Sequence, residues 1–325
     1  MSRPIADVSL DLDNKWSYLK THGDPSWESY PSYLEFVVPR ILDILAEHSL
    51  RITFFVVGQD AAIDENLPVL RSIASAGHEI GNHSFHHEPW LQKYSPEQLE
   101  REFDLTEKAL ARVTDHPLRG FRGPGYSLSP EVLDLLCRRG YLYDGSTLPT
   151  FIGPLARAYY FLRSNLSREE TETRSSLFGS VRDGLRPIKP YYWDTAHGPL
   201  LEIPVTTIPF VRAPFHFSYL MFLAQRSEWL AESYFRLALS LCRLTGTSPS
   251  LLVHPTDFLG GDEVTEMEFF PAMGMPGERK RNFMRRVLGI LAKGWQVMPM
   301  GEKAQRLAGD QRHRLPCLAP AFDAG

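Results

Sequence analysis

Short apolar stretches alternate with amphipathic stretches along the first part of the chain. Residues 5–12 are β-branched and alternating and predict a short buried strand, and residues 51–58 predict a second strand that ends at a glycine. Between them, apolar residues recur at helical spacing over residues 32–48 and predict an amphipathic helix. The polar stretch at 14–33, rich in tryptophan and tyrosine, is expected to be a loop.

Glycine, serine and proline mark the ends of the next predicted elements. A helix over residues 67–76 is expected to end at Gly77, and Ser95 followed by Pro96 is typical of a helix N-terminus. In this part we expect strands at 78–81, 118–121 and 141–144, and helices at 95–113 and 129–139. Four successive strand-then-helix units predict a parallel α/β architecture like a barrel, with functional residues at the C-terminal ends of its strands.

The pattern breaks between residues 149 and 199, where arginine and tyrosine are frequent. A long stretch without secondary structure inside a compact domain is typical of a lid, a binding loop or a disordered segment. The stretch between residues 149 and 199 can also be interpreted as a solvated surface, or as a contact region for an anionic substrate such as a diphosphate-linked sugar. Beyond it we expect strands at 200–205, 250–255 and 295–300, and helices at 228–245 and 277–293. The predicted organisation is one domain over residues 1–306, with an insertion at about 150–199 and a flexible tail at 307–325.

Composition and charge exclude several classes of protein. The 325 residues are 43% hydrophobic and 23% charged, as in an ordinary soluble domain, and a formal net charge of −4 gives no argument for nucleic-acid binding. Cys137, Cys242 and Cys317 are odd in number and widely spaced, which favours a reduced compartment over a disulfide framework. The first residues lack the features of a secretory signal, and no apolar run approaches the roughly 20 residues that cross a bilayer. We therefore expect a cytoplasmic protein.

Three histidines fall within five residues directly after a predicted strand. His83 and His87 are four residues apart, a spacing that places both rings on one face of a helical turn, as in other two-histidine zinc sites. Surface or core histidines satisfied by hydrogen bonds give the same pattern. A catalytic site would need a carboxylate from elsewhere in the chain.

Candidate carboxylates stand at the end of the first predicted strand. Asp11 and Asp13 point the same way on a period of two, although a pair of capping or turn aspartates would look the same. A closed barrel would bring several strand ends together across the whole sequence. The polar residues at these ends are Asp11, Asp13, His83, His87, Arg122, Asp144 and His254.

Four short motifs occur in a fixed order along about residues 5–300. They are Ser9-Leu10-Asp11-Leu12-Asp13, His83-Ser84-Phe85-His86-His87, Arg122-Gly123-Pro124 and Leu251-Leu252-Val253-His254. With these motifs in this order, the chain resembles the polysaccharide deacetylase family. These proteins are also called the NodB-homology or carbohydrate esterase family 4 hydrolases. The chain's first motif has the spaced Asp-x-Asp form of an intracellular branch. The resemblance implies an irregular (β/α)-barrel of about seven strands.

The chain departs from the family pattern at two places. Asp144-Gly145-Ser146 stands near the family's fourth motif but lacks the tryptophan of that motif. Tyr126 stands one residue beyond the family's aromatic position, which Gly125 occupies here.

The resemblance also implies roles for the residues in the motifs. Asp13, His83 and His87 would hold a divalent metal, with zinc favoured and cobalt, nickel or iron left open. Asp11 would be the general base, Arg122 would keep it ionised, and His254 would be the general acid. The expected substrate-contacting residues are Pro124, Gly125, Tyr126 and Asp144, and backbone N–H groups near Gly125 and Tyr126 would stabilise an oxyanion.

The function implied is a metal-dependent amide hydrolase that removes an N-acyl group, acetyl or formyl, from an amino sugar in a glycan or a lipid-linked precursor. Two alternatives stay open: a hydrolase of cyclic amides or ureides, resembling imidases and allantoinases, and an inactive sugar-binding module with the same fold. A homo-oligomer and a peripheral membrane contact through residues 215–229 stay open as well, although a buried helix face explains that apolar segment too.

Overall fold

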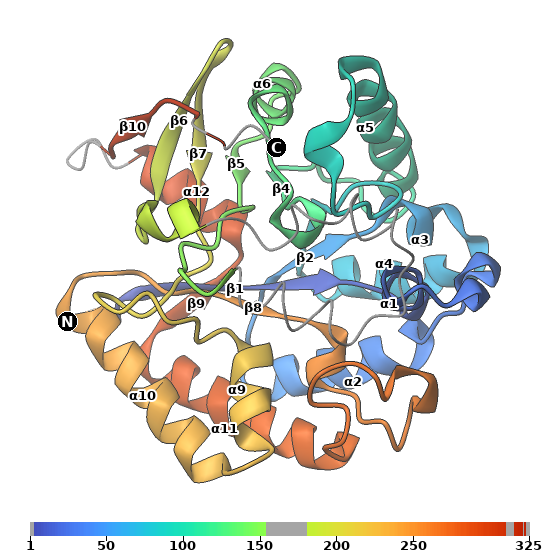
Figure 1. Ribbon diagram of the computed structural model, residues 1–325, viewed down its shortest axis with the longest axis vertical. Helices are drawn as coiled ribbons and strands as arrows, with labels where there is room; N and C mark the ends of the chain where they lie inside the picture. The colour runs from blue at the N-terminus through green and yellow to red at the C-terminus, as the bar shows by residue number, and fades with distance from the viewer. Residues whose placement is uncertain (1–2, 154–180, 310–314, 321, 323–325) are drawn as a thin grey trace.

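The computed structural model describes residues 3–153, 181–309, 315–320 and 322. Ten strands of this part form one sheet with helices around its outside (Figure 1). Seven neighbouring strands, in the spatial order β8-β1-β2-β3-β4-β5-β7, are parallel to one another, which confirms the predicted α/β fold. These strands are β1 (Ile5–Leu12), β2 (Thr53–Val56), β3 (Glu79–Asn82), β4 (Gly120–Phe121), β5 (Tyr143–Asp144), β7 (Gly198–Glu202) and β8 (Ser250–Val253).

Three further strands extend the sheet beyond the expected seven. β6 (Tyr191–Thr195) is antiparallel to β7, β10 (Cys317–Leu318) pairs with β6, and β9 (Gln296–Met298) pairs with β1. β6 lies in the stretch expected to lack secondary structure, and β10 lies in the expected tail. Residues 154–180 of the predicted insertion lie outside the described residues.

Helices cover the sheet, with α9, α10 and α11 at the bottom of Figure 1 and α5 and α6 at the top. None of the helices in the described ranges is both long and apolar enough to cross a membrane, and the expected cytoplasmic location stays a prediction. The α-helices are α1 (Lys15–His22), α2 (Leu34–Glu47), α3 (Gly58–Ala62), α4 (Leu67–Ser75), α5 (Pro96–Leu110), α6 (Pro130–Arg138), α9 (Phe217–Ala224), α10 (Glu228–Leu244), α11 (Gly277–Gly294) and α12 (Met300–Gly309).

Helix α1 corrects the prediction of a loop at residues 14–33. The Asn14 side chain accepts a hydrogen bond from the Lys15 N–H at 2.8 Å and caps the helix, and Gly23 ends it with φ 88°. The helix buries four consecutive residues, Trp16–Leu19, instead of one face. A helix without an amphipathic period leaves no helical pattern in the sequence.

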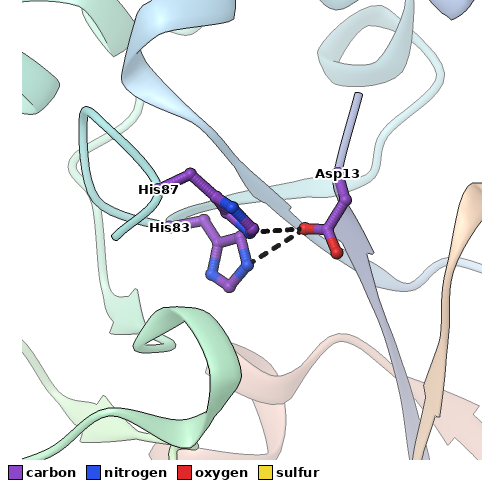
Figure 2. Close-up of side chains that lie close together, drawn as sticks. All are labelled: Asp13, His83 and His87. Atoms are coloured by element: carbon purple, nitrogen blue, oxygen red, sulfur yellow. Dashed lines mark hydrogen bonds and ion pairs between the residues drawn. The ribbon is translucent and has the colours of Figure 1, made fainter. Parts of the chain in front are cut away.

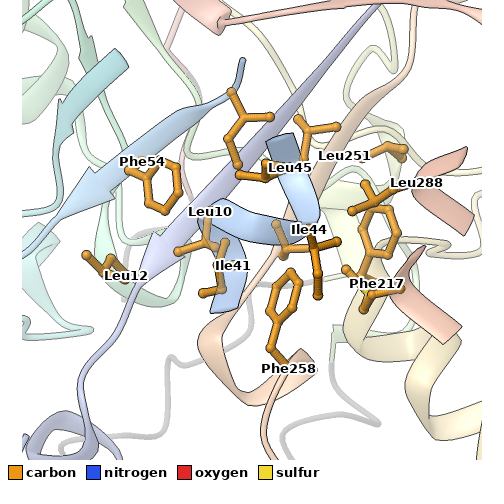
Figure 3. Close-up of a cluster of buried hydrophobic side chains, with 14 of the residues drawn as sticks. Leu10, Leu12, Ile41, Ile44, Leu45, Phe54, Phe217, Leu251, Phe258 and Leu288 are labelled. Carbon is orange, nitrogen blue, oxygen red and sulfur yellow. The ribbon is translucent and has the colours of Figure 1, made fainter. Parts of the chain in front are cut away.

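The main apolar core lies between β1 and the helices packed on it. Ile41 and Leu45 of α2 contact this core beside Leu10 of β1, together with Phe217 of α9 and Leu288 of α11 (Figure 3). All five side chains are fully or almost fully buried. Helix α9 therefore presents a buried face, the interpretation favoured for its apolar sequence.

The register of the sheet aligns the predicted site residues. Leu10 of β1 pairs with Val253 of β8, so Asp11 and His254 are the next residues on adjacent parallel strands. On the other side of β1, Asp11 pairs with Phe55 of β2. Because the strands are parallel, their polar C-terminal ends lie at one edge of the sheet.

Candidate metal centre and catalytic site

Asp13, His83 and His87 converge at this edge, as predicted. Oδ1 of Asp13 lies 3.0 Å from Nε2 of His87 and 3.3 Å from Nε2 of His83 (Figure 2). One ligand atom from each of the three residues lies within 4.8 Å of the others. Two imidazoles and one carboxylate, all largely buried, are a donor set that suits zinc and leaves positions for water and substrate.

The two histidines lie on a turn and not on a helix, which corrects the helical interpretation of their spacing. Ser84 and His87 have left-handed backbone conformations, with φ 59° and 54°. The Ser84 N–H donates to Oδ1 of Asn82 at 2.8 Å, and the His87 N–H donates to Oγ of Ser84 at 3.2 Å. Side-chain acceptors thus replace helical hydrogen bonds and allow the sharp turn that brings both rings together.

A backbone carbonyl fixes the orientation of the His83 ring. Nδ1 of His83 lies 2.6 Å from the Arg122 carbonyl oxygen, which can only accept, so Nδ1 carries the proton. In the neutral ring Nε2 then turns its lone pair toward Asp13. This carbonyl–imidazole contact is a common support for a metal-binding histidine.

The charges of the cluster favour a bound cation. Burial raises the pKa of Asp13, but the positive charge of His87 and hydrogen bonds from both rings outweigh it and hold that pKa well below the usual value. Burial lowers the pKa of His83, but Asp11 and Asp13 raise it to a net value above the usual one. Without a metal the site attracts protons, which a divalent ion would displace.

Asp11 lies beside this cluster and faces the buried guanidinium of Arg122. Nη1 of Arg122 lies 3.6 Å from Oδ1 of Asp11, and Nη2 donates to Oγ of Ser9 at 3.2 Å. The guanidinium stacks over Phe55 at 4.8 Å. Among the described residues, Oδ1 of Asp11 has no hydrogen-bond partner. Arg122 therefore places a positive charge beside this buried, unpartnered oxygen.

His254 follows β8 and is held by two residues that the sequence analysis did not identify. Its Nδ1 lies 3.0 Å from Oγ of Ser218, whose hydroxyl donates to Oδ2 of Asp257 at 3.2 Å. Oδ2 of Asp257 also accepts from the His254 N–H at 2.9 Å. Because the Ser218 proton goes to Asp257, the Ser218 oxygen accepts from Nδ1 of His254, which leaves Nε2 for chemistry.

A signal in the sequence could have identified one of these two residues. Asp257 stands three residues after His254 and closes the same short turn, Pro255–Asp257. Ser218 lies 36 residues earlier, on α9, and no local pattern connects it to His254.

The predicted substrate-contacting residues lie at the ends of β4 and β5. Gly125 and Tyr126 have φ 58° and 63°, and Tyr126 is half-buried. Burial raises the pKa of the Tyr126 phenol; Arg122 lowers it, whereas Asp11 and Asp13 raise it further, so the phenol stays neutral beside these three groups. Pro124 is buried in the same turn.

Asp144 is fully buried and belongs to a polar network under this turn. Its carboxylate accepts from the hydroxyl and the N–H of Ser146 at 2.6 and 3.0 Å. Oγ of Ser146 accepts in turn from the Gly123 N–H at 2.8 Å, and burial next to Asp144 raises the pKa of Glu202 well above its usual value. These contacts support the turn, and a contact of Asp144 with substrate stays a prediction.

Comparison with known proteins agrees with the motifs. Residues 26–143 match the family model for polysaccharide deacetylase. Over 92 residues the chain is 37% identical to a peptidoglycan-N-acetylglucosamine deacetylase of Bacillus cereus, covering 28% of this chain and 32% of the relative. It is 41% identical over 75 residues to a chitooligosaccharide deacetylase of Rhizobium leguminosarum, covering 23% and 32%. The matched segments thus span about a third of each of these relatives.

A solved structure extends the similarity in fold to almost the whole chain. It is described as a polysaccharide deacetylase from Mycobacterium smegmatis. It is 20% identical, covers 99% of this chain and 98% of its own, and has a TM-score of 0.61. At this identity the similarity concerns the fold alone. Residues 26–143 match the polysaccharide deacetylase family, and the motifs before and after this segment agree with that match.

Proposed function

We propose that this chain is a metal-dependent hydrolase that removes an N-acyl group, acetyl or formyl, from an amino sugar in a glycan or in a lipid-linked glycan precursor. The observation that carries the proposal is the position of Oδ1 of Asp13, 3.0 and 3.3 Å from the two imidazole nitrogens. The relatives named above, which act on amino sugars by their names, support the class of substrate.

Asp13, His83 and His87 would hold the metal, with zinc favoured and cobalt, nickel and iron as alternatives. A divalent ion bound there would polarise the acyl carbonyl and lower the pKa of a bound water. The protein's own contribution to holding the ion is a buried carboxylate and two oriented rings.

The remaining residues would move the protons. The Asp11 carboxylate would accept the proton of the attacking water, and Arg122, whose Nη1 lies 3.6 Å from Oδ1 of Asp11, would hold that carboxylate in place. Nε2 of His254 would donate a proton to the departing amine, because Nδ1 is bound to Ser218. Backbone N–H groups in the turn at Gly125 and Tyr126 would stabilise the oxyanion.

The test combines metal content with product release from the full chain. Released acetate and formate are measured with nucleotide-linked, lipid-linked and polymeric amino sugars, and with cyclic ureides. Asp13→Ala should lose the metal, because it removes the only carboxylate of the donor set. Asp11→Asn should keep the metal and lose about 10²–10⁴-fold in rate, because it removes the base. Asp43→Asn, an exposed change on α2, is the control and should behave as wild type.

Each result decides between the candidate functions. A wild-type rate in Asp11→Asn would remove the base assignment. Absence of stoichiometric metal in the wild-type protein would favour the inactive sugar-binding module. Turnover of cyclic ureides without release of acetate or formate would favour the cyclic-amide alternative.

A further inference from the structure

One buried carboxylate holds the turn that carries both candidate histidine ligands. Glu102 of α5 is 2% exposed. Its Oε1 accepts hydrogen bonds from the N–H groups of Phe85 and His86 at 2.8 and 2.7 Å, and its Oε2 lies 2.7 Å from Nδ1 of His86. Glu102 therefore binds the middle of the segment between His83 and His87.

Side-chain oxygens, and not backbone carbonyls, bind the N–H groups of this turn. The N–H groups of residues 84–87 all donate to side-chain oxygens: those of 84 and 87 to Asn82 and Ser84, and those of 85 and 86 to Glu102. The carbonyls of Ser84 and Phe85 accept from the N–H groups at 58 and 59, at the start of α3. Two residues of the turn have φ near +55° to +60°, which L-residues rarely adopt without outside support.

Glu102 stands on a rigid element. Helix α5 begins with a reciprocal capping box between Ser95 and Gln98, and it packs against α3. Phe103, the next residue, is fully buried and packs beside Phe121 of β4. A carboxylate on a capped and packed helix can therefore fix the position of the turn that it binds.

We propose that Glu102 is a positioning residue for the metal centre. By binding Phe85 and His86, it fixes the turn so that the rings of His83 and His87 converge on Asp13. The proposal rests on the proposed metal-dependent function. His86 is then no ligand: its ring completes the bonding of Glu102, and its side chain is 46% exposed.

A measurement of zinc affinity distinguishes a role of Glu102 in positioning the histidines from a role in folding alone. The apparent Kd for zinc is measured in the full chain by competition with a chromogenic chelator, below the melting temperature, with circular dichroism as the check on folding. Glu102→Ala should weaken zinc binding by about 10–100-fold, the range typical for partners that orient metal ligands. Excess zinc should restore its turnover, because the catalytic groups remain in place.

Variants of graded severity isolate the bonds that matter. Glu102→Gln keeps one oxygen that can accept from both N–H groups, so its zinc affinity should fall less than tenfold. His86→Ala keeps both hydrogen bonds from the backbone N–H groups to Glu102, so its zinc affinity should fall least. Glu100→Ala is the matched control, because Glu100 is on the same helix and pairs with Arg138, the last residue of α6, and with Arg139 after it. It should lower the melting temperature and leave zinc affinity unchanged.

The outcomes distinguish failure of the inference from failure of the proposed function. Wild-type zinc affinity in folded Glu102→Ala would overturn the positioning role and leave the proposed function intact. A wild-type protein that binds no zinc or other divalent metal would overturn the proposed function. If Glu102→Ala does not fold, Glu102→Asp decides, because its shorter carboxylate cannot reach the turn in the same way. Wild-type affinity there would also overturn the inference.

Discussion

Arg122 contacts both the candidate base, Asp11, and a candidate metal ligand, His83, through different atoms. Its guanidinium faces Asp11 at 3.6 Å, and its carbonyl accepts from the His83 ring at 2.6 Å. The side chain is completely buried, so its charge is not screened by water. A shift of the backbone at Arg122 would therefore disturb the base and a metal ligand together.

The contact between Ser218 and His254 leads to a prediction about the general acid. Ser218→Ala removes the oxygen that accepts from Nδ1 of His254, so the ring loses its fixed orientation. We expect kcat to fall with little change in KM. The fall in kcat should be smaller than in His254→Ala, which removes general acid catalysis and should cost about 10²–10⁴-fold. Steady-state kinetics measure both constants, with a substrate identified by the release of acetate or formate.

A serine on a neighbouring helix provides the control. Ser240→Ala changes an exposed hydroxyl on α10 whose bond is to its own helix, and it should leave kcat unchanged. If Ser218→Ala also turned over at the wild-type rate, the hydroxyl would have no part in orienting His254.

At this scale the sequence predicted the residues that belong to motifs and missed those that support them. Asp13 and His83 come together as expected because each directly follows the end of a strand, and the turn after His83 adds His87. Glu102 and Ser218 stand on helices and reach the site across the fold. Such contacts follow no period and no spacing, so the sequence carries no signal for them.

At the scale of elements, the packing of α3 against α5 depends on one glycine. A Cβ on Gly58 would lie 2.7 Å from the ring of Phe85 and 3.0 Å from the backbone of Thr106. Gly58 also donates its N–H to the Ser84 carbonyl at 2.8 Å, so α3, α5 and the histidine turn meet at this point. The close approach needs a residue without a side chain.

Gly58→Ala should therefore destabilise the protein by about 1–3 kcal/mol, as overpacking usually does, and should weaken zinc binding because the turn must move. Urea unfolding and zinc titration measure the two effects. Gly274→Ala is the control, since a Cβ there would meet nothing within 4 Å. Stability equal to wild type in Gly58→Ala would show that α3 and α5 can separate without cost.

Element boundaries were predictable where period and caps agreed. β1 spans Ile5–Leu12 as expected, and α5 begins after Ser95 as its capping signal indicated. α1 was missed because it buries consecutive residues. β6 was missed because frequent arginine and tyrosine obscured an alternation in which Tyr191 and Trp193 are buried and Asp194 is exposed.

At the scale of the whole molecule, a buried histidine should make folding stability depend on pH. His78 is 9% exposed, and its Nδ1 accepts from the Ile52 N–H at 3.1 Å, which requires a neutral ring. Burial, together with the charge of Arg51, lowers its pKa to about 4. The unfolded chain, with a histidine pKa near 6.5, binds more protons between these values.

The free energy of unfolding should therefore fall as pH drops from about 6.5 to 4, and His78 should account for about 2 kcal/mol between pH 7 and 5. His78→Asn keeps an acceptor for Ile52 and does not titrate, so it should lose correspondingly less stability over this range. Urea unfolding of both proteins, with chelator present to remove metal effects, gives the difference. Equal pH dependence in the two proteins would show that His78 is not buried neutral.

The overall architecture was the most predictable part of the molecule. Seven parallel strands and the gathering of polar residues at one edge of the sheet follow from the alternation of strands and helices in the sequence. The β6–β7 hairpin and the pairing of β10 were not predicted. The pairing of β10 depends on a contact between segments far apart in the chain, Cys317 with Tyr192, which no local pattern records.

The position of β1 has a consequence for biosynthesis. This strand leaves the ribosome long before β8, its neighbour in the sheet, whose Ser250 bonds to Asp7 across 243 residues. At about 5–20 residues per second, one edge of this apolar strand waits roughly 10–50 s for its neighbour. During that interval the nascent chain exposes an unpaired strand edge, a natural target for a molecular chaperone.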